Sequence, residues 1–110
     1  MEKSIDPDRP NMVGVIHTAG GFLQAGIPGL DAVEIRVDAL SGPPEARQIA
    51  ELPVAPIVTV RCVEEGGLQS ISDDDRCASY LALLPAAAAI DLELRSAESM
   101  SDLRKAVLKD

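Results

Sequence analysis

Apolar residues follow two kinds of spacing along this chain, and the spacing typical of β-strands is the clearer one. Ala32–Leu40 (AVEIRVDAL) and Ala89–Arg95 (AIDLELR) alternate between apolar and polar residues. Pro56–Cys62 (PIVTVRC) is rich in β-branched residues, and Met12–Ala19 (MVGVIHTA) is a short apolar run. Because alternation and β-branched composition are typical of strands, each of these segments is predicted to be one.

Helical spacing occurs between and after the predicted strands. The predicted helices are Pro43–Leu52, Ser72–Leu84 and Ser96–Asp110, with a short or irregular helix at Gly20–Gly29. Prolines suit the first turn of the first of these, and Ser72 is expected to cap the second. The apolar residues of that second helix that recur at helical spacing are Cys77, Leu81 and Leu84. Strands thus alternate with helices, which indicates a parallel sheet.

The alternating strands carry charges on one of their two faces. In the strand Ala32–Leu40 one face holds Val33, Ile35 and Val37, and the other holds Glu34, Arg36 and Asp38. A half-exposed antiparallel sheet with a wet outer face would explain this pattern, but the intervening helices favour parallel strands. Charges inside a parallel sheet are costly unless they are paired or bind a ligand. The predicted fold class is therefore α/β, a (β/α)4 half of a TIM-type (β/α)8 barrel whose polar interior forms a pocket.

Size and charge narrow the classes of function. A chain of 110 residues is enough for one domain over 1–110, with residues 1–11 expected to be an N-terminal tail. The net charge of −8 argues against nucleic acid or an anionic membrane as a partner. No apolar run approaches the ~18 residues of a membrane span, and no signal peptide is visible. Cys62 and Cys77 form no metal pattern and are expected to be reduced. A cytoplasmic protein without cofactor or metal is predicted.

Candidate site residues lie at the carboxyl ends of the predicted strands. Arg61 stands near the end of one strand, with Glu65 in the loop beyond it, and Glu34 and Arg36 project from the neighbouring strand. Functional groups of parallel barrels gather at this end. Two arginines can bind a carboxylate and hydroxyls of a small anion, and a nearby carboxylate can orient a base. The alternative is that these residues form salt bridges only.

Other polar and glycine residues near this end have expected structural roles. Asp91 and Glu93 are expected to neutralise the arginines inside the barrel. Asp38 is expected to cap the turn that follows it. Gly66 and Gly67 are expected to let the loop turn with positive φ.

These residues resemble type I 3-dehydroquinate dehydratase. The resemblance rests on Val33–Leu40, Ile57–Gly67, Tyr80 and Ile90–Ser96, in this order. It implies a (β/α)8 barrel that dehydrates 3-dehydroquinate to 3-dehydroshikimate in the shikimate pathway, without a metal. It also implies that a lysine forms a Schiff base with the substrate ketone and that a histidine acts as general acid and base.

Residue by residue, the resemblance implies roles for four positions. Glu34, Arg36 and Arg61 would contact the substrate, and Glu65 would support the catalytic histidine through a hydrogen bond. The family's histidine and lysine lie on strands that would follow the last predicted helix of this chain. The chain is therefore expected to be the substrate-binding half of the barrel, from a truncated reading frame, an engineered fragment or a split protein, and to be inactive alone.

The only histidine and the lysines do not replace the missing groups. His17 is expected to be a surface or loop residue, and Lys3, Lys105 and Lys109 lie in the tail or the last helix. Two alternatives stay open. One is a non-catalytic half-barrel that binds small carboxylates or a partner chain, as a homodimer or with a complementing C-terminal half. The other is a different barrel enzyme that uses the same charged residues.

Overall fold

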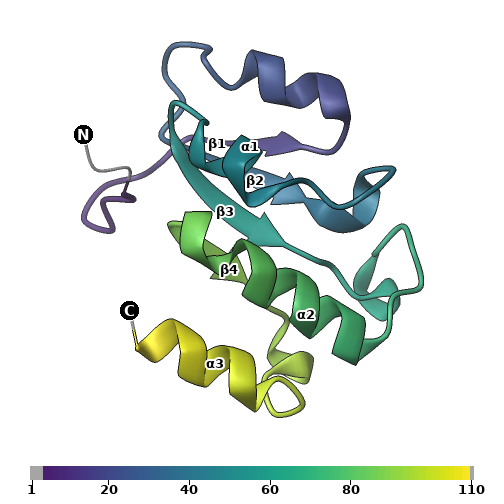
Figure 1. Cartoon of the computed structure of the whole chain (residues 1–110). Helices are drawn as coiled ribbons and strands as arrows, with labels where there is room; N and C mark the ends of the chain where they lie inside the picture. The colour runs from purple at the N-terminus through teal and green to yellow at the C-terminus, as the bar shows by residue number, and fades with distance from the viewer. Residues whose placement is uncertain (1–3, 110) are drawn as a thin grey trace.

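The centre of the molecule is a parallel sheet, seen in a computed structural model that describes residues 4–109. Its strands are β1 (Val13–Ile16), β2 (Ala32–Arg36), β3 (Ala55–Thr59) and β4 (Ala89–Asp91), which lie in the order β1-β2-β3-β4. Each neighbouring pair is parallel (Figure 1). Chain order and spatial order are the same, as expected of one half of a TIM-type barrel. The predicted α/β class with parallel strands is confirmed.

Helices connect successive strands. The α-helices are α1 (Ala46–Ala50), α2 (Asp73–Leu83) and α3 (Ser101–Leu108). Short 3-10 turns occur at η1 (Ala19–Gln24), η2 (Val37–Ala39), η3 (Val63–Glu65), η4 (Leu84–Ala86) and η5 (Leu94–Ser96). The glycine-rich segment after β1 thus forms a 3-10 turn, as predicted. None of the helices in the described part of the chain is long and apolar enough to cross a membrane.

The apolar core lies between one face of the sheet and the helices. The sheet side is built from Val33, Ile35, Val58 and Val60, and the helix side from Ile49, Tyr80, Leu83 and Leu103. Figure 1 shows α1 and α2 on the same side of the sheet. The opposite face, which carries Glu34 and Arg36, is only partly covered by the described residues. This asymmetry agrees with the alternation of the sequence.

Several elements are shorter than the sequence predicts. β2 ends at Arg36 because the next residues turn into η2, and β4 ends at Asp91. The prolines before α1 are not in its first turn. Instead Glu45 is the N-cap, and it forms a reciprocal capping box with Gln48. After β3, side-chain acceptors replace the ladder of the sheet: the N–H of Val60 donates to Tyr80 and the N–H of Cys62 to Glu93.

α2 shows one confirmed prediction and one wrong one. Ser72 caps the helix, with its hydroxyl accepting from the N–H of Asp75 at 3.1 Å. The expected apolar stripe is not the buried one, because Leu81 is 40% exposed. The helix instead turns Arg76 and Tyr80 inward, and both are fully buried. Their polar groups find partners at the ends of the strands, which fixes this rotation of the helix.

The histidine and lysines stand apart from the polar face of the sheet. His17 follows β1 and is exposed, as predicted. Lys105 and Lys109 lie on and just after α3, and both are exposed. Lys3 lies outside the described residues. Among the described residues, no amine or imidazole therefore lies on the charged face.

Candidate functional site

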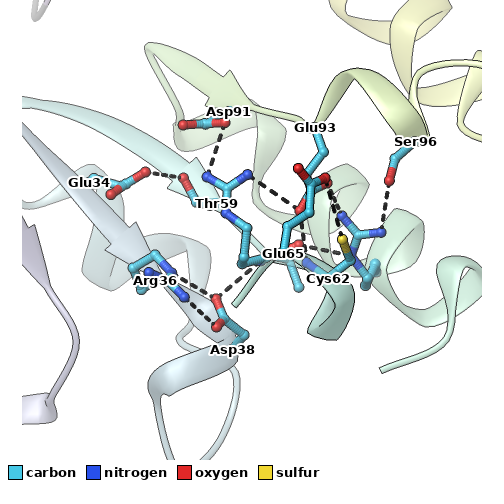
Figure 2. Close-up of polar contacts among 12 residues, drawn as sticks. Glu34, Arg36, Asp38, Thr59, Cys62, Glu65, Asp91, Glu93 and Ser96 are labelled. Carbon is cyan, nitrogen blue, oxygen red and sulfur yellow. Dashed lines mark hydrogen bonds and ion pairs between the residues drawn. The ribbon is translucent and has the colours of Figure 1, made fainter. Parts of the chain in front are cut away.

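A row of polar side chains crosses the last residues of three strands. Arg36 of β2 is in register with Thr59 of β3, and Thr59 is in register with Asp91 of β4. Paired residues of parallel strands share a face, so these side chains stand side by side. Glu34, two residues before Arg36, accepts a hydrogen bond from the Thr59 hydroxyl at 2.8 Å. Residues that are distant in sequence thus meet on the face away from the helices (Figure 2).

Arg61 follows β3 and reaches across to the carboxylates of the β4 segment. Its guanidinium lies 3.2 Å from Asp91 Oδ1 and 3.4 Å from Glu93 Oε2. Burial alone would lower the pKa of Arg61, but Asp91 and Glu93 outweigh burial and raise that pKa above its ordinary value. The expected neutralisation of an arginine by Asp91 and Glu93 is therefore present.

Asp38 is a completely buried carboxylate beside these arginines. It accepts two hydrogen bonds from the Arg36 guanidinium, at 3.0 and 2.8 Å. It also accepts from the backbone N–H of Arg61 at 3.1 Å and of Leu68 at 3.2 Å. Burial alone would raise the pKa of Asp38, but these donors hold it below its ordinary value. The expectation that Asp38 caps the turn that follows it is wrong, because its side-chain oxygens accept from Arg36 and from the backbone of the segment after β3 instead.

Glu93 is a second buried carboxylate, on the β4 side of the cluster. It accepts from the N–H of Cys62 at 2.7 Å and forms an ion pair with Arg76. Burial alone would raise the pKa of Glu93, but these donors and its own backbone N–H outweigh it and lower the pKa to about 2. Arg76 also donates to the carbonyl of Val60 at 2.8 Å and to the hydroxyl of Ser96 at 3.2 Å. This network ties α2 to the ends of β3 and β4.

Glu65 lies at the edge of this cluster, on the exposed turn η3. Its Oε2 is 3.8 Å from the Cys62 thiol. Ligand atoms of Cys62, Glu65 and Glu93 all lie within 4.8 Å of one another, a spacing that could hold a metal ion. However, Glu93 is already bound to Arg76, and burial raises the pKa of the Cys62 thiol. A guanidinium and a protonated thiol oppose a cation here, so the arrangement favours an ion-pair network.

The loop that carries Glu65 depends on two glycines for different reasons. Gly66 has φ of 96°, a left-handed conformation that suits glycine. Gly67 does not have positive φ, which corrects that part of the prediction. A Cβ on Gly67 would lie 2.4 Å from the Arg61 carbonyl oxygen. Gly67 is therefore needed for a close approach of the loop to the backbone of Arg61.

The structure brings Glu34, Arg36 and Arg61 together and places Glu65 at their border. Figure 2 shows Glu34 and Arg36 on the β2 side and Glu93 on the opposite side. Sequence reasoning missed Thr59 and Arg76 as members of the network. Thr59 is two residues before Arg61, so the alternation of side chains along the strand places both on the same face and could have identified Thr59. The role of Arg76 is hard to find from the sequence, because its local partner Asp73 indicates only a helix ion pair, whereas its buried partners Val60 and Glu93 are 16 and 17 residues away.

One comparison with known proteins identifies a family. A model of the type I 3-dehydroquinase family matches residues 23–109, which include the whole polar cluster. No curated protein matches the chain.

Proposed function

Because this chain belongs to the type I 3-dehydroquinase family, we propose that it carries the substrate-binding half of a 3-dehydroquinate dehydratase site. In this role Glu34, Arg36 and Arg61 contact 3-dehydroquinate, as the resemblance of the sequence implies. The observation that carries the proposal is the gathering of these side chains at the carboxyl ends of adjacent parallel strands. The proposed reaction is loss of water to give 3-dehydroshikimate, as in the shikimate pathway.

Arg36 is suited to donating a hydrogen bond to a ligand. Arg36 uses Nε and Nη2 for Asp38, while its Nη1 has no partner among the described residues. Its side chain is 24% exposed, on the open face of the sheet. Because the positive charge is already balanced by Asp38, Arg36 can donate to a neutral hydroxyl at little electrostatic cost. Glu34 offers the complementary acceptor oxygens.

Glu65 is proposed to support a catalytic histidine that another segment supplies. It is exposed and stands at the rim of the cluster. A carboxylate in such a position can accept a hydrogen bond from an imidazole and orient it. The exposed position is consistent with a partner that approaches from the open side.

The 110-residue chain is proposed to be inactive alone. Schiff-base chemistry needs a lysine amine in the pocket. Among the described residues, Lys105 and Lys109 are exposed on the α3 side and His17 is exposed after β1. None of them lies on the face that carries Glu34 and Arg36. A cytoplasmic location is part of the same proposal, because the substrate is a biosynthetic intermediate.

The proposed partner is a second barrel half, either a complementing C-terminal half or another copy of this chain. Both edges of the sheet favour this. On the edge strand β1, Val13 and Val15 are 42% and 52% exposed, and Leu94, in the turn η5 that follows the other edge strand β4, is 93% exposed. Unpaired, apolar sheet edges are sites where another chain adds strands. Analytical ultracentrifugation distinguishes the cases: a stable dimer supports self-association, and a monomer that binds an added C-terminal half supports complementation.

Two measurements test the proposed function. In the first, 3-dehydroquinate is titrated into the 15N-labelled chain, and the amide shifts of the β2 and β3 ends should move. Arg61→Lys should weaken binding about tenfold or more, because lysine lacks the planar set of donors. Arg47→Lys, at a position on α1 with a 77% exposed side chain, is the matched control and should bind normally. Absence of binding by the unmodified chain would contradict the proposal.

The second measurement follows the absorbance of the conjugated product. The chain alone should give no turnover. Adding a C-terminal half that supplies the lysine and histidine strands should produce turnover that depends on Arg36 and Arg61. Substantial turnover by the chain alone would show that the proposal of inactivity is wrong and that another amine does the chemistry.

A further inference from the structure

The side chain of Asp38 makes more hydrogen bonds within the cluster than any of the residues proposed to contact the substrate. Its carboxylate is fully buried, although an unpaired charge in such a place would be very costly. It holds the guanidinium of Arg36 with two parallel hydrogen bonds, at 3.0 and 2.8 Å. The same two oxygens accept the backbone N–H groups of Arg61 and Leu68, at 3.1 and 3.2 Å. One side chain thus fixes a side chain of β2 and the backbone of the segment after β3.

The attachment continues through the backbone around Asp38. The side-chain amide of Gln69 donates to the carbonyls of Asp38 and Leu40, each at 2.9 Å. Both ends of the segment 61–69 are therefore hydrogen-bonded to Asp38 of η2, and its last residue is also bonded to Leu40. Glu65 lies within this segment, on the turn η3. Its location depends on these attachments at both ends of the segment, together with the backbone hydrogen bonds of η3 and the bond from the Cys62 N–H to Glu93.

We propose that Asp38 is a positioning residue for the substrate-binding cluster. It holds the Arg36 guanidinium in one orientation, places the backbone of Arg61, and attaches the loop that carries Glu65. This inference rests on the proposed function of that cluster. Asp38 does not itself touch the substrate, because its side chain is completely buried behind Arg36 and its oxygens are occupied.

The side-chain amide of an asparagine cannot accept the four hydrogen bonds that the Asp38 carboxylate accepts. All the contacts of the Asp38 carboxylate are with N–H donors, two from a guanidinium and two from the backbone. Asparagine offers one acceptor oxygen and an NH2 group that would face donors. Asp38→Asn therefore removes part of the attachment without a change in size. Both Arg36 and the N–H of Arg61 should move by small distances that a binding site detects.

The chain offers a matched control at the opposite end of the same strand. Asp31, just before β2, accepts from Arg9 Nη2 at 2.6 Å and from the backbone N–H of Met12 at 2.7 Å. Asp31→Asn therefore removes the same kind of carboxylate, with an arginine and a backbone donor, at the amino end of the sheet. Any general cost of this substitution should appear in both variants, whereas an effect on the cluster should appear only in Asp38→Asn.

The experiment measures 3-dehydroquinate affinity and amide spectra of the 110-residue chain and both variants. We expect Asp38→Asn to bind the ligand about tenfold more weakly or worse, and Asp31→Asn to bind within about twofold of the unmodified chain. In the ligand-free spectra of Asp38→Asn, the amides of residues 61–69 should shift while those of β1 stay in place. Unfolding in urea gives the stability of each variant, so that affinity is compared for folded protein.

The outcomes separate positioning from stability and from the proposed function. Equal affinity in Asp38→Asn and the unmodified chain would overturn the inference, and so would equal losses in both variants. If the unmodified chain does not bind 3-dehydroquinate, the proposed function fails, and the ligand-free spectra decide about Asp38. A shift confined to residues 61–69 and Arg36 then supports positioning. Unchanged spectra in that segment overturn it.

Discussion

Arg76 and Glu93 form an ion pair in which neither side chain reaches solvent, with side-chain exposures of 0% and 2%. The pair joins the first half of α2 to the segment after β4. Each partner also holds the end of β3: Arg76 donates to the carbonyl of Val60, and Glu93 accepts from the N–H of Cys62. A buried pair of this kind contributes less to stability than its geometry implies, because both charges lose their hydration. The pair fixes the relative position of α2, the end of β3 and the segment after β4.

Breaking this pair should be strongly destabilising. Arg76→Met removes the closer of the two guanidinium groups beside the buried Glu93 carboxylate and leaves Arg61 at 3.4 Å, so the free energy of unfolding should fall by about 3 kcal/mol, the lower end for a broken buried pair. Urea unfolding followed by circular dichroism measures the change. Arg47→Met is the control, because within residues 4–109 the Arg47 guanidinium is paired only with Glu45 and both side chains are largely exposed. Its effect should stay within about 0.5 kcal/mol. Similar losses in the two variants would contradict the importance of the buried pair.

Acid should weaken the fold through Glu93. The pKa of Glu93 is lowered from 4.5 to about 2 in the folded chain, so its contribution is complete above about pH 4.5 and is lost as the pH falls towards 2. Unfolding free energies should therefore decrease between these values. In Glu93→Gln this part of the acid dependence should be missing. Glu51→Gln, at an exposed position after α1, should keep the dependence of the unmodified chain. An identical acid dependence in all three proteins would refute the assignment.

The hydroxyl of Tyr80 joins β3 to β4 from the helix side. It accepts from the N–H of Val60 at 2.9 Å and donates to the carbonyl of Asp91 at 2.6 Å. Burial raises the pKa of Tyr80 to about 12, so the hydroxyl stays protonated as the donor. Tyr80→Phe leaves the buried N–H of Val60 without this acceptor and should cost about 1–3 kcal/mol of unfolding free energy. Ser79→Ala removes a hydroxyl from the neighbouring position, and a loss of equal size there would argue against this role.

A methyl group on Gly67 should displace the loop that carries Glu65. The added Cβ would meet the carbonyl oxygen of Arg61 at 2.4 Å, closer than any real contact allows. Gly67→Ala should therefore shift the amide signals of Arg61 and of the loop, and weaken ligand binding. Gly42→Ala is the control, because nothing lies within 4 Å of a Cβ at Gly42 and its φ is not positive. Unchanged loop signals in Gly67→Ala would show that the loop adapts.

The sequence predicts the fold better than it predicts the details of the cluster. Alternation in the segment around Glu34 and Arg36 depends only on the pleat of a strand, and the structure has the expected parallel sheet. The cap at Ser72 is equally local and is also found. By contrast, the buried face of α2 is shifted relative to the apolar pattern. Charged residues are seldom fully buried, yet Arg76 is, because it pairs with Glu93, 17 residues later in the chain.

By itself, the sequence determined the order and type of the elements and the candidates Glu34, Arg36 and Arg61, because period and spacing depend on neighbouring residues. The tertiary structure alone decided how their charges are balanced. Asp38 binds the guanidinium of Arg36 and the backbone N–H of Arg61. Glu93 forms ion pairs with Arg61 and Arg76. Such pairings depend on how strands and helices meet in space, because a charge inside the fold is stable only where a distant segment supplies its counterpart.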